Sequence, residues 1–392
     1  MTEQRLRELL RESVAHESGP DLADAAWEQS RRSRRRSRLA AVAGSVAAVV
    51  VVAGGVALLE RPDAGLAPMP APGVSSPVGE ADADLDGTPV WWSPTGADEA
   101  ALPSIGRSLT RLPEEIDLSA RAADIATAPL DQALAAFAVL DDFGVQRLLL
   151  LGADGSYRTL DISALDPVTK PNGYLLPPES PSMLSPDGRT LLFPQDGHLE
   201  LYDLRANAWR RIETGSRPTA FATWTAEGQI HLPRSSGSTS GPVYDVAGEL
   251  VGAADLHPPT EGIPLGQAAV YGVTRTSPDR SSVAQSWSIG AGVPAPSDTF
   301  ADPEIMVVTP GIDSSILAFP ESGDQPVRWK QCCPAAGWLD DDTVVYESRK
   351  AVPQLIAWRI GTHDFHTVTT ITGFTAGQES YTASWADLDR VG

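Results

Sequence analysis

The two cysteines of this 392-residue chain, Cys332 and Cys333, are adjacent. A vicinal disulfide is the one intramolecular bond open to them, and such a ring is strained and comparatively reducible. A redox switch would need a third thiol or a nearby basic cluster to activate the pair, and the sequence offers neither. We therefore predict a structural role, as a rigid turn or as a pair of buried free thiols.

Two groups of side chains resemble the beginnings of metal sites. Asp82, Asp84 and Asp86, followed by Gly87, match the first half of a calcium loop, but the position that needs a bidentate glutamate is Ser93. His363 and His366 are three residues apart around an expected turn, and no third ligand for zinc is evident. The sequence therefore predicts no metal site and no cofactor.

No arrangement typical of nucleophilic catalysis is present either. Gly237–Gly241 has the sequence GSTSG, which places Thr where a nucleophile elbow needs its nucleophile, among Ser and Gly. We interpret it as a flexible loop, name no catalytic residue and predict that the chain is not an enzyme. A propeller glycoside hydrolase or lyase remains the alternative, which would require convergent carboxylates that one sequence cannot identify.

The elements that must position these groups are short strands. Beyond Thr88, apolar runs alternate with turn signals such as Asp154-Gly155, Asp187-Gly188 and Asp196-Gly197. With 34 Gly, 33 Pro and 21% charged residues, the composition also favours a loop-rich β protein. Ten Trp recur mainly on these runs, and we expect most of them to pack in the core.

A hairpin pattern repeats along the chain. Residues 146–161, 198–213 and 354–369 align without gaps, each with a strand, a turn, an aromatic residue and, three positions later, an aliphatic residue. A shorter relative spans 242–252. Turns at Asp187, Glu227, Asp279, Asp341 and Asp387 have spacings of 40 to 62 residues, and the longest suggests an extra unit around 306–319. Such periods are typical of propeller blades.

A family resemblance follows from one of these units. SPDGRTLLFPQDGHLELYDL, residues 185–204, is similar to the repeat of TolB-like and WD-repeat-like β-propellers, with a degenerate copy of its turn in SPDR, residues 277–280. The resemblance covers about one blade, and the Trp-Asp dipeptide is missing. At roughly 40 to 45 residues per blade, 88–392 predicts an all-β propeller of about seven blades, six or eight being the alternatives. The last strand, around 381–388, is expected to complete the first blade. A two-sheet sandwich, or two smaller β domains, is the competing architecture.

The N-terminal part predicts a membrane anchor. Residues 39–59 are uncharged and long enough, at 1.5 Å per residue, to span roughly 30 Å of hydrocarbon as one transmembrane helix. The basic cluster before them predicts a cytoplasmic N-terminus; its members are Arg31, Arg32, Arg34, Arg35, Arg36 and Arg38. A cleaved signal peptide is the alternative, with an apolar run that would normally be shorter. Residues 60–87 are interpreted as a Pro/Gly-rich linker to the propeller of 88–392.

Charge separates the two sides of this predicted span. Residues 1–38 have nine Arg and seven Asp or Glu, which gives them a charge of +2. Because the whole chain has a net charge of −21, the rest of the chain carries −23. An acidic exterior domain excludes nucleic acid as a partner, and the arginines beside the span are expected to contact anionic lipid. We therefore expect the protein in the cell membrane, with the propeller outside the cytoplasm, where it binds an unknown protein or glycan. Envelope signalling is one role that such binding can serve.

The tail, residues 1–38, is a short and partly helical cytoplasmic segment. Leu6, Leu9, Leu10 and Val14 fall on one helical face. The tail is similar to the cytoplasmic starts of actinobacterial membrane proteins that are associated with extracytoplasmic-function sigma factors, although it lacks the His and Cys pattern of zinc-binding anti-sigma domains. That resemblance implies a cytoplasmic sigma factor as a partner, with a solvated tail as the alternative.

Overall fold

The chain divides into two units, Met1–Ala71 and Pro72–Gly392. The computed structural model describes residues 79–105, 109–139, 147–170, 173–233, 240–255, 269–288, 304–310, 314–319, 333–350, 352–373 and 381–388, all in the second unit. The predicted tail and span lie outside these ranges. Within them, no helix combines the length and the apolar character that crossing a membrane requires.

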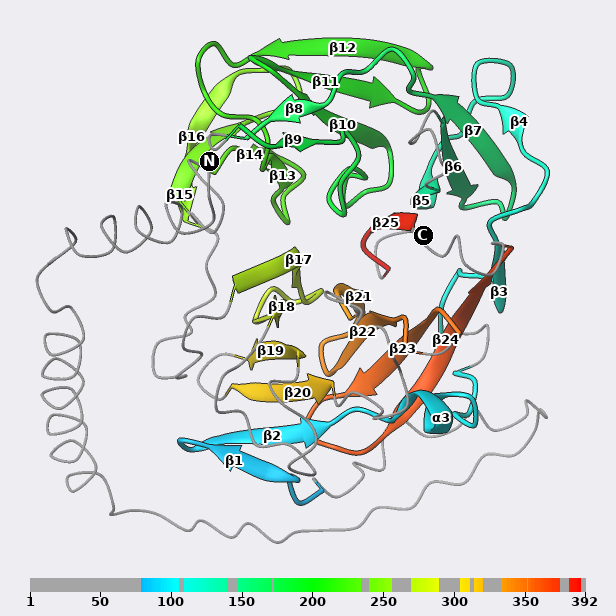
Figure 1. Cartoon of the computed structure of the whole chain (residues 1–392), viewed down its shortest axis with the longest axis vertical. Coiled ribbons are helices and arrows are strands. Elements are labelled where there is room, and N and C mark those ends of the chain that lie inside the picture. The colour runs from blue at the N-terminus through cyan, green and yellow to red at the C-terminus, as the bar shows by residue number, and fades with distance from the viewer. Residues whose placement is uncertain are drawn as a thin grey trace, which may run out of the picture. The chain divides into compact units, whose positions relative to one another are not determined.

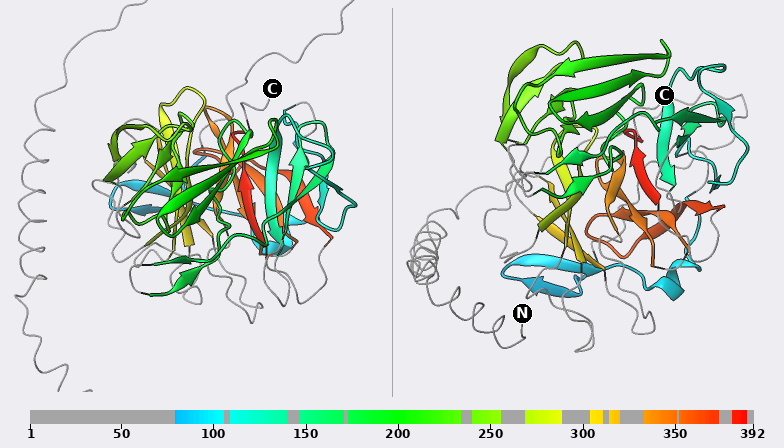
Figure 2. Two further views of the ribbon diagram at one scale, coloured as in Figure 1. Left: turned by 90° about the horizontal axis from the view of Figure 1, so that it is seen from above. Right: turned by 45° about the horizontal axis from the view of Figure 1, so that its top comes forward.

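The described strands form a β-propeller of five blades arranged around a centre (Figures 1 and 2). The prediction of an all-β propeller is confirmed, and the predicted number of about seven blades is wrong. The strands, from the centre outward, are β25 (Tyr381–Trp385), β5 (Ala133–Val139), β6 (Arg147–Gly152) and β7 (Tyr157–Asp161) in blade 1; β10 (Thr190–Gln195), β11 (His198–Asp203) and β12 (Ala208–Glu213) in blade 2; β13 (Thr223–Trp224), β14 (Ile230–His231), β15 (Ser240–Tyr244) and β16 (Leu250–Asp255) in blade 3; β17 (Ala269–Thr276), β18 (Ser282–Ser288), β19 (Glu304–Pro310) and β20 (Ser315–Phe319) in blade 4; β21 (Ala335–Asp340), β22 (Thr343–Ser348), β23 (Gln354–Arg359) and β24 (Phe365–Thr372) in blade 5.

Blade 4 explains much of the error in the blade count. The suggested extra unit at 306–319 is not a blade of its own, because β19 and β20 are the outer strands of the sheet that begins with β17. Blade 4 therefore spans residues 269–319, which is more than the 40 to 45 residues assumed for one blade. The fourth strand of blade 2 is reduced to one bridge, between Leu184 and Leu191, and a separate ribbon pairs β8 (Val168–Thr169) with β9 (Leu175–Leu176).

The repeated hairpin is confirmed as the outer pair of strands in a blade. Residues 146–161, 198–213 and 354–369 coincide with β6–β7, β11–β12 and β23–β24, and the shorter relative coincides with β15–β16. The conserved spacing serves packing: Leu160, Ile212 and Val368 are all buried at the same place in their strands. Apolar residues at these positions fill the space between neighbouring blades.

The C-terminal strand closes the ring, as predicted. β25 is the innermost strand of blade 1 and pairs antiparallel with β5, from Tyr381–Val139 to Trp385–Ala135. Its aromatic side chains pack on Phe137, with ring centroids 5.4 Å from Trp385 and 6.2 Å from Tyr381. A buried carboxylate, Glu347 in β22, accepts hydrogen bonds from Tyr381 Oη at 2.8 Å and Trp385 Nε1 at 3.3 Å. Blades 1 and 5 are therefore joined by both apolar and charged contacts.

Most of the tryptophans pack in the core, as expected. Trp91, Trp224, Trp287, Trp338, Trp358 and Trp385 are all buried. Of the other described tryptophans, Trp92 is half-buried, and Trp209 on the outer strand β12 is 43% exposed.

An N-terminal belt, which we define as the described part of residues 79–125, runs along the outside of three blades (Figure 1). It adds a parallel strand to each outer edge: β2 (Thr88–Trp92) to β20, β3 (Glu115–Asp117) to β24 and β4 (Ala123–Asp124) to β7. β1 (Ala83–Leu85) forms a hairpin with β2, and so a strand lies inside the range interpreted as linker. The one described helix, α3 (Gly96–Glu99), lies between β2 and β3.

Candidate functional site

The aspartates that resembled a calcium loop hold the first hairpin of the belt. Asp84 Oδ1 accepts the amide of Gly87 at 2.8 Å, and Asp82 Oδ2 accepts the amide of Trp92 at 2.8 Å. Asp82 Oδ2 also lies 2.9 Å from His363 Nε2, which ties the belt to blade 5. The described residues contain no group of three or more side chains able to hold a metal.

The other residues singled out in the sequence are only partly described. Cys333 is fully buried beside β21, whereas Cys332 lies outside the described residues, so the vicinal disulfide stays a prediction. The basic cluster, Arg31, Arg32, Arg34, Arg35, Arg36 and Arg38, also lies outside them. Of the GSTSG loop, only Ser240 and Gly241 are described, and they begin β15.

A buried cation lies on the inner strand of blade 4. Arg275 of β17 is buried there, with Nη1 3.9 Å from Asp387 Oδ1, and burial lowers the pKa of its guanidinium. Beside it is a cavity of about 20 Å³, lined from blades 2, 3 and 4 and by the segment after β25. Such a volume holds about one water molecule. This cavity is therefore too small for an organic ligand.

The belt is fastened to blade 5 by a buried ion pair. Glu99, at the end of α3, and Lys350, just after β22, have Oε1 and Nζ 3.5 Å apart, and their side chains are 0% and 9% exposed. Lys350 Nζ also donates to Ser93 Oγ at 2.6 Å and to the Pro94 carbonyl at 2.7 Å. Glu99 accepts from Ser348 Oγ at 2.8 Å.

Burial changes the acidity of both members of this pair. Desolvation raises the pKa of Glu99 above its ordinary value, and Lys350 opposes that shift. Desolvation also lowers the pKa of Lys350 to about 8, against the attraction of Glu99. Both directions follow from the cost of placing charges in a medium of low polarity. Because Ser93, Pro94 and Glu99 all belong to the belt, this pair fixes the path of the belt over blade 5.

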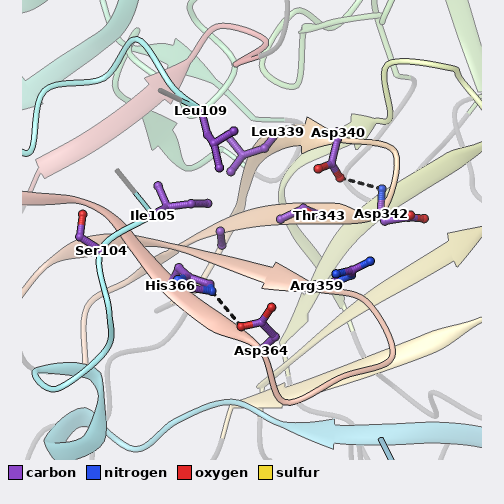
Figure 3. Close-up of a pocket in the computed structure, with 11 residues that line it drawn as sticks. Ser104, Ile105, Leu109, Leu339, Asp340, Asp342, Thr343, Arg359, Asp364 and His366 are labelled. Carbon is purple, nitrogen blue, oxygen red and sulfur yellow. Dashed lines mark hydrogen bonds and ion pairs between the residues drawn. The ribbon is translucent and has the colours of Figure 1, made fainter. Parts of the chain in front are cut away.

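Past this fastening, the belt and blade 5 enclose a cavity of about 360 Å³, which we call the belt pocket (Figure 3). The belt contributes Ser104, Ile105 and Leu109, and blade 5 contributes residues at and beside its β21–β22 and β23–β24 turns. The lining residues are Ser104, Ile105, Leu109, Leu339, Asp340, Asp342, Thr343, Ala357, Arg359, Asp364 and His366. Its volume is at the lower end of the range usual for small-molecule sites.

The strands of blade 5 explain why these side chains share one face. Thr343 is paired with Arg359, and Ala357 with His366, in the registers of β22–β23 and β23–β24. Opposite residues in antiparallel strands project to the same side. The opposite face of the sheet is apolar and packs toward blade 4. Its residues include Trp338, Val344, Trp358 and Phe365. The pocket side of the sheet carries Val345 and Ala357 in the cluster that packs toward blade 1, so the polar lining lies at the rim of an apolar face.

Two of the carboxylates in the pocket have assigned structural partners. Asp364 Oδ1 lies 2.8 Å from His366 Nε2, and Asp340 Oδ1 accepts the amide of Asp342 at 2.9 Å (Figure 3). His366 Nδ1 is buried and has no hydrogen-bond partner among the described residues. Asp364 therefore fixes the orientation of the imidazole ring.

The pocket combines an apolar part with a charged part. In Figure 3, Ile105, Leu109 and Leu339 lie on one side, and the aspartates and Arg359 on the other. With His366 neutral, three carboxylates face one guanidinium, so the lining has a net charge of −2. Such a lining favours an amine over an anion, while Arg359 can pair with a carboxylate of the same ligand.

Sequence reasoning did not find this pocket. His363 and His366 were considered as a zinc pair, but the structure directs them to different places: His363 to Asp82 of the belt and His366 to Asp364 of the pocket. The alternation of polar residues in residues 357–366 was a weak signal for one polar face. Nothing in the sequence around Ser104, Ile105 and Leu109 indicated that these three residues would line a pocket with blade 5.

The comparisons with known proteins give little beyond the fold class. No family model matches the chain, and no curated protein does. Similar solved structures include hydrazine synthase from Kuenenia stuttgartiensis (14% identity, TM-score 0.25, 54% of this chain and 61% of that one) and the WD40 repeats of RRP9 (14%, 0.28, 64% and 86%). Another is a protein described as TolB from Agrobacterium tumefaciens (12%, 0.17, 60% and 53%). At these TM-scores the likenesses carry no argument about activity or partners, and the propeller assignment rests on the sheets themselves.

Proposed function

We propose that the chain is a membrane-anchored binding protein, whose propeller lies outside the cytoplasm and takes a small amine-bearing ligand, such as an amino acid or short peptide, in the belt pocket. The observation that carries the proposal is the lining of that pocket, with three carboxylates, one guanidinium and an apolar side. The anchor is supported by the sequence of residues 39–59 and the basic cluster before it.

The route from pocket to membrane supports a signalling role. Ser104, Ile105 and Leu109 line the pocket and belong to the belt, which continues toward the predicted linker and span. A ligand that touches both the belt and blade 5 favours the conformation in which they are joined, by as much as its affinity differs between the two states. Binding outside can in this way change the segment that leads to the membrane.

The cytoplasmic side of the proposal concerns residues 1–38. Their amphipathic Leu face and their resemblance to sigma-factor-associated tails support a sigma factor as the partner there. The test is mass spectrometry after capture of the full-length protein from membranes, beside a variant without residues 1–38. Recovery of a sigma factor with the full-length protein but not with the variant that lacks the tail supports this partner. Equal recovery with both proteins, or recovery with neither, contradicts it.

An enzyme is the less supported alternative. A glycoside hydrolase or lyase needs carboxylates that act on the two sides of a bound sugar. In the belt pocket, Asp340 holds the Asp342 amide and Asp364 holds His366, so two of the three carboxylates have positioning roles. The lining also contains no Trp, Tyr or Phe on which a sugar ring could stack. Binding accounts for these residues better than hydrolysis does.

The proposed binding is tested by thermal unfolding of the full chain in detergent, with free amino acids, dipeptides and polyamines as probes. An amine that binds should raise Tm, because at a concentration of a hundred times Kd it adds about 2.7 kcal/mol to the free energy of unfolding. Asp342→Asn and Arg359→Ala should weaken the response to a zwitterion at least tenfold. Glu227→Gln, at an exposed turn of blade 3, is the matched control and should respond as wild type does. Equal responses in all variants, or a response to neutral polyols alone, would contradict the proposal.

A further inference from the structure

Blade 3 has an open groove beside its outermost strand, which we call the blade 3 groove. It has a volume of about 600 Å³, which is within the range usual for small-molecule sites. Residues 250–253 of β16 line it, together with the start of β15, the residues after β14 and the connection from β12 to β13. The belt strands β2, β3 and β4 pair with blades 4, 5 and 1, so none of them covers β16 (Figure 1).

The lining of the groove is mainly aliphatic. Leu232 is buried, Leu250 and Val251 are 56% and 49% exposed, and three prolines add to the apolar surface. Adjacent exposed aliphatic side chains are typical of binding surfaces. Among the described residues that line the groove, none is a Trp, Tyr or Phe on which a ring could stack, so the lining suits an aliphatic chain. Residues 250–253 extend over roughly 10 Å and give such a chain a path along the strand.

Two glycines determine the shape of the groove. At Gly241, a Cβ would lie 2.0 Å from the Leu232 carbonyl oxygen, so β15 and the residues after β14 approach closely and close the groove on that side. At Gly252, a Cβ would meet nothing within 4 Å. The space at Gly252 is therefore open to a ligand, and a side chain introduced there would occupy this space without a clash.

The groove has one charged side chain in its lining, which is Arg217. Its guanidinium lies over the ring of Tyr244, 5.7 Å from the centroid, and its Nη1 donates to Tyr244 Oη. Tyr244 is buried, so it holds the guanidinium in one place. Among the described residues, no carboxylate is paired with Arg217. A guanidinium has five N–H donors, and those that Tyr244 does not use can hold a carboxylate in bidentate geometry.

We propose that the blade 3 groove binds a small aliphatic monocarboxylate, with its carboxylate on Arg217 and its chain along Leu250 and Val251. Charge complementarity carries this choice of ligand. The chain has a net charge of −21, which repels anions, whereas the lining of the groove has a charge of +1 and no carboxylate that could hold an amine. The groove is thus opposite in sign to the belt pocket, and the inference does not depend on the amine site proposed there.

The test is thermal unfolding of the full chain in detergent, with hexanoate as the probe and hexanol as its neutral analogue of equal chain length. We expect hexanoate to raise Tm of wild type, and hexanol to need at least a tenfold higher concentration, because the pair with Arg217 is charge-assisted. Arg217→Gln removes the cation and should weaken the hexanoate response roughly tenfold or more. Arg210→Gln, which removes an exposed cation of β12, is the matched control and should respond as wild type does.

A second variant blocks the groove and leaves Arg217 in place. Gly252→Leu fills the open space beside β16 and should weaken the hexanoate response at least tenfold. Ala208→Leu, which adds the same side chain on the exposed strand β12, should respond as wild type does. Three results would overturn the inference: no response of wild type at tens of millimolar, equal responses to hexanoate and hexanol, or an unchanged response in Arg217→Gln. Loss of the response in Arg359→Ala alone would place the carboxylate in the belt pocket and would overturn it as well.

Photochemical labelling locates the bound carboxylate in the wild-type chain. An aliphatic carboxylic acid that carries a diazirine should label peptides that contain Leu232 or residues 250–253, and excess hexanoate should suppress this label. Suppression by hexanoate of a label at Ser104 or Leu109 instead, or of no label at all, would contradict the proposed site.

Discussion

The ion pair that fastens the belt gives a quantitative prediction. Lys350→Met keeps most of the side-chain volume, including the part near the ring of Phe319, but removes the charge opposite Glu99. The Glu99 side chain is 0% exposed, so the variant leaves a carboxylate in the interior without its cation. Breaking one partner of a buried pair typically costs about 3 to 5 kcal/mol. At roughly 2 °C per kcal/mol for a large domain, we expect Tm to fall by about 6 to 10 °C.

The second partner decides whether this cost comes from the charge. In Glu99→Gln/Lys350→Met, the buried charge is gone and the amide can still accept from Ser348, so most of the lost stability should return. Arg205→Met, at a side chain that is 78% exposed, is the control for loss of a surface cation and should change stability by less than about 0.5 kcal/mol. The assay is thermal and urea unfolding of the full chain, followed by tryptophan fluorescence.

The pH dependence of the same pair has a definite sign. The pKa of Lys350 is lowered from 10.5 to about 8 in the native state. Between these values the unfolded chain holds the proton and the native state has released it, so the free energy of unfolding should rise with pH from about 8 to 10.5. Lys350→Met should lack this rise. Two results would refute the conclusion that this pair holds the belt. One is equal stability of Lys350→Met and Glu99→Gln/Lys350→Met, and the other is a free energy of unfolding that still rises with pH in Lys350→Met.

Three further predictions concern the frame of the propeller. Gly188→Ala should cost several kcal/mol, because its φ of 68° is left-handed and a Cβ there would be 2.2 Å from the Ala133 carbonyl oxygen, whereas Gly155→Ala, at φ 77° in open space, should cost about 1 kcal/mol by urea unfolding. Tyr381→Phe should lose about 1.5 to 3 kcal/mol, the usual value of a hydrogen bond to a charged group, since its hydroxyl donates to Glu347 at 2.8 Å; a Tm equal to wild type would argue against that bond. Termination after residue 380 removes β25 with the buried Tyr381 and Trp385, and should abolish the cooperative unfolding transition seen by calorimetry; a sharp transition near the wild-type temperature would mean that ring closure is dispensable.

The parts of the fold that the sequence could predict are those with local signals. The offset between 146–161 and 198–213 identified the outer hairpins, because the strand, the turn and the buried Leu160 or Ile212 lie close together in sequence. The closing strand could be predicted because a propeller requires its last strand to complete the first blade. Blade number could not be predicted, because loops within a blade lengthen its period without changing its hairpins.

The belt and the pocket depend on contacts that have no sequence pattern. β3 and β4 have only three and two residues, so neither has an alternation that could be recognised, and β3 pairs in parallel with a strand far along the chain. Glu99 meets a lysine about 250 positions later only because the belt passes over blade 5. The belt pocket arises from the same passage, so its lining residues could be ranked only after the path of the belt was known.

The most direct test of the account is the side of the membrane on which the propeller lies. Ala208→Cys, exposed on β12, and Ser18→Cys, in the tail, would each be treated in intact cells with a membrane-impermeant maleimide, beside wild type as the background from Cys332 and Cys333. The account predicts that Ala208→Cys is labelled and that Ser18→Cys is labelled only after the cells are opened. Labelling of Ser18→Cys in intact cells with Ala208→Cys protected, or protection of both, would contradict an anchored propeller outside the cytoplasm.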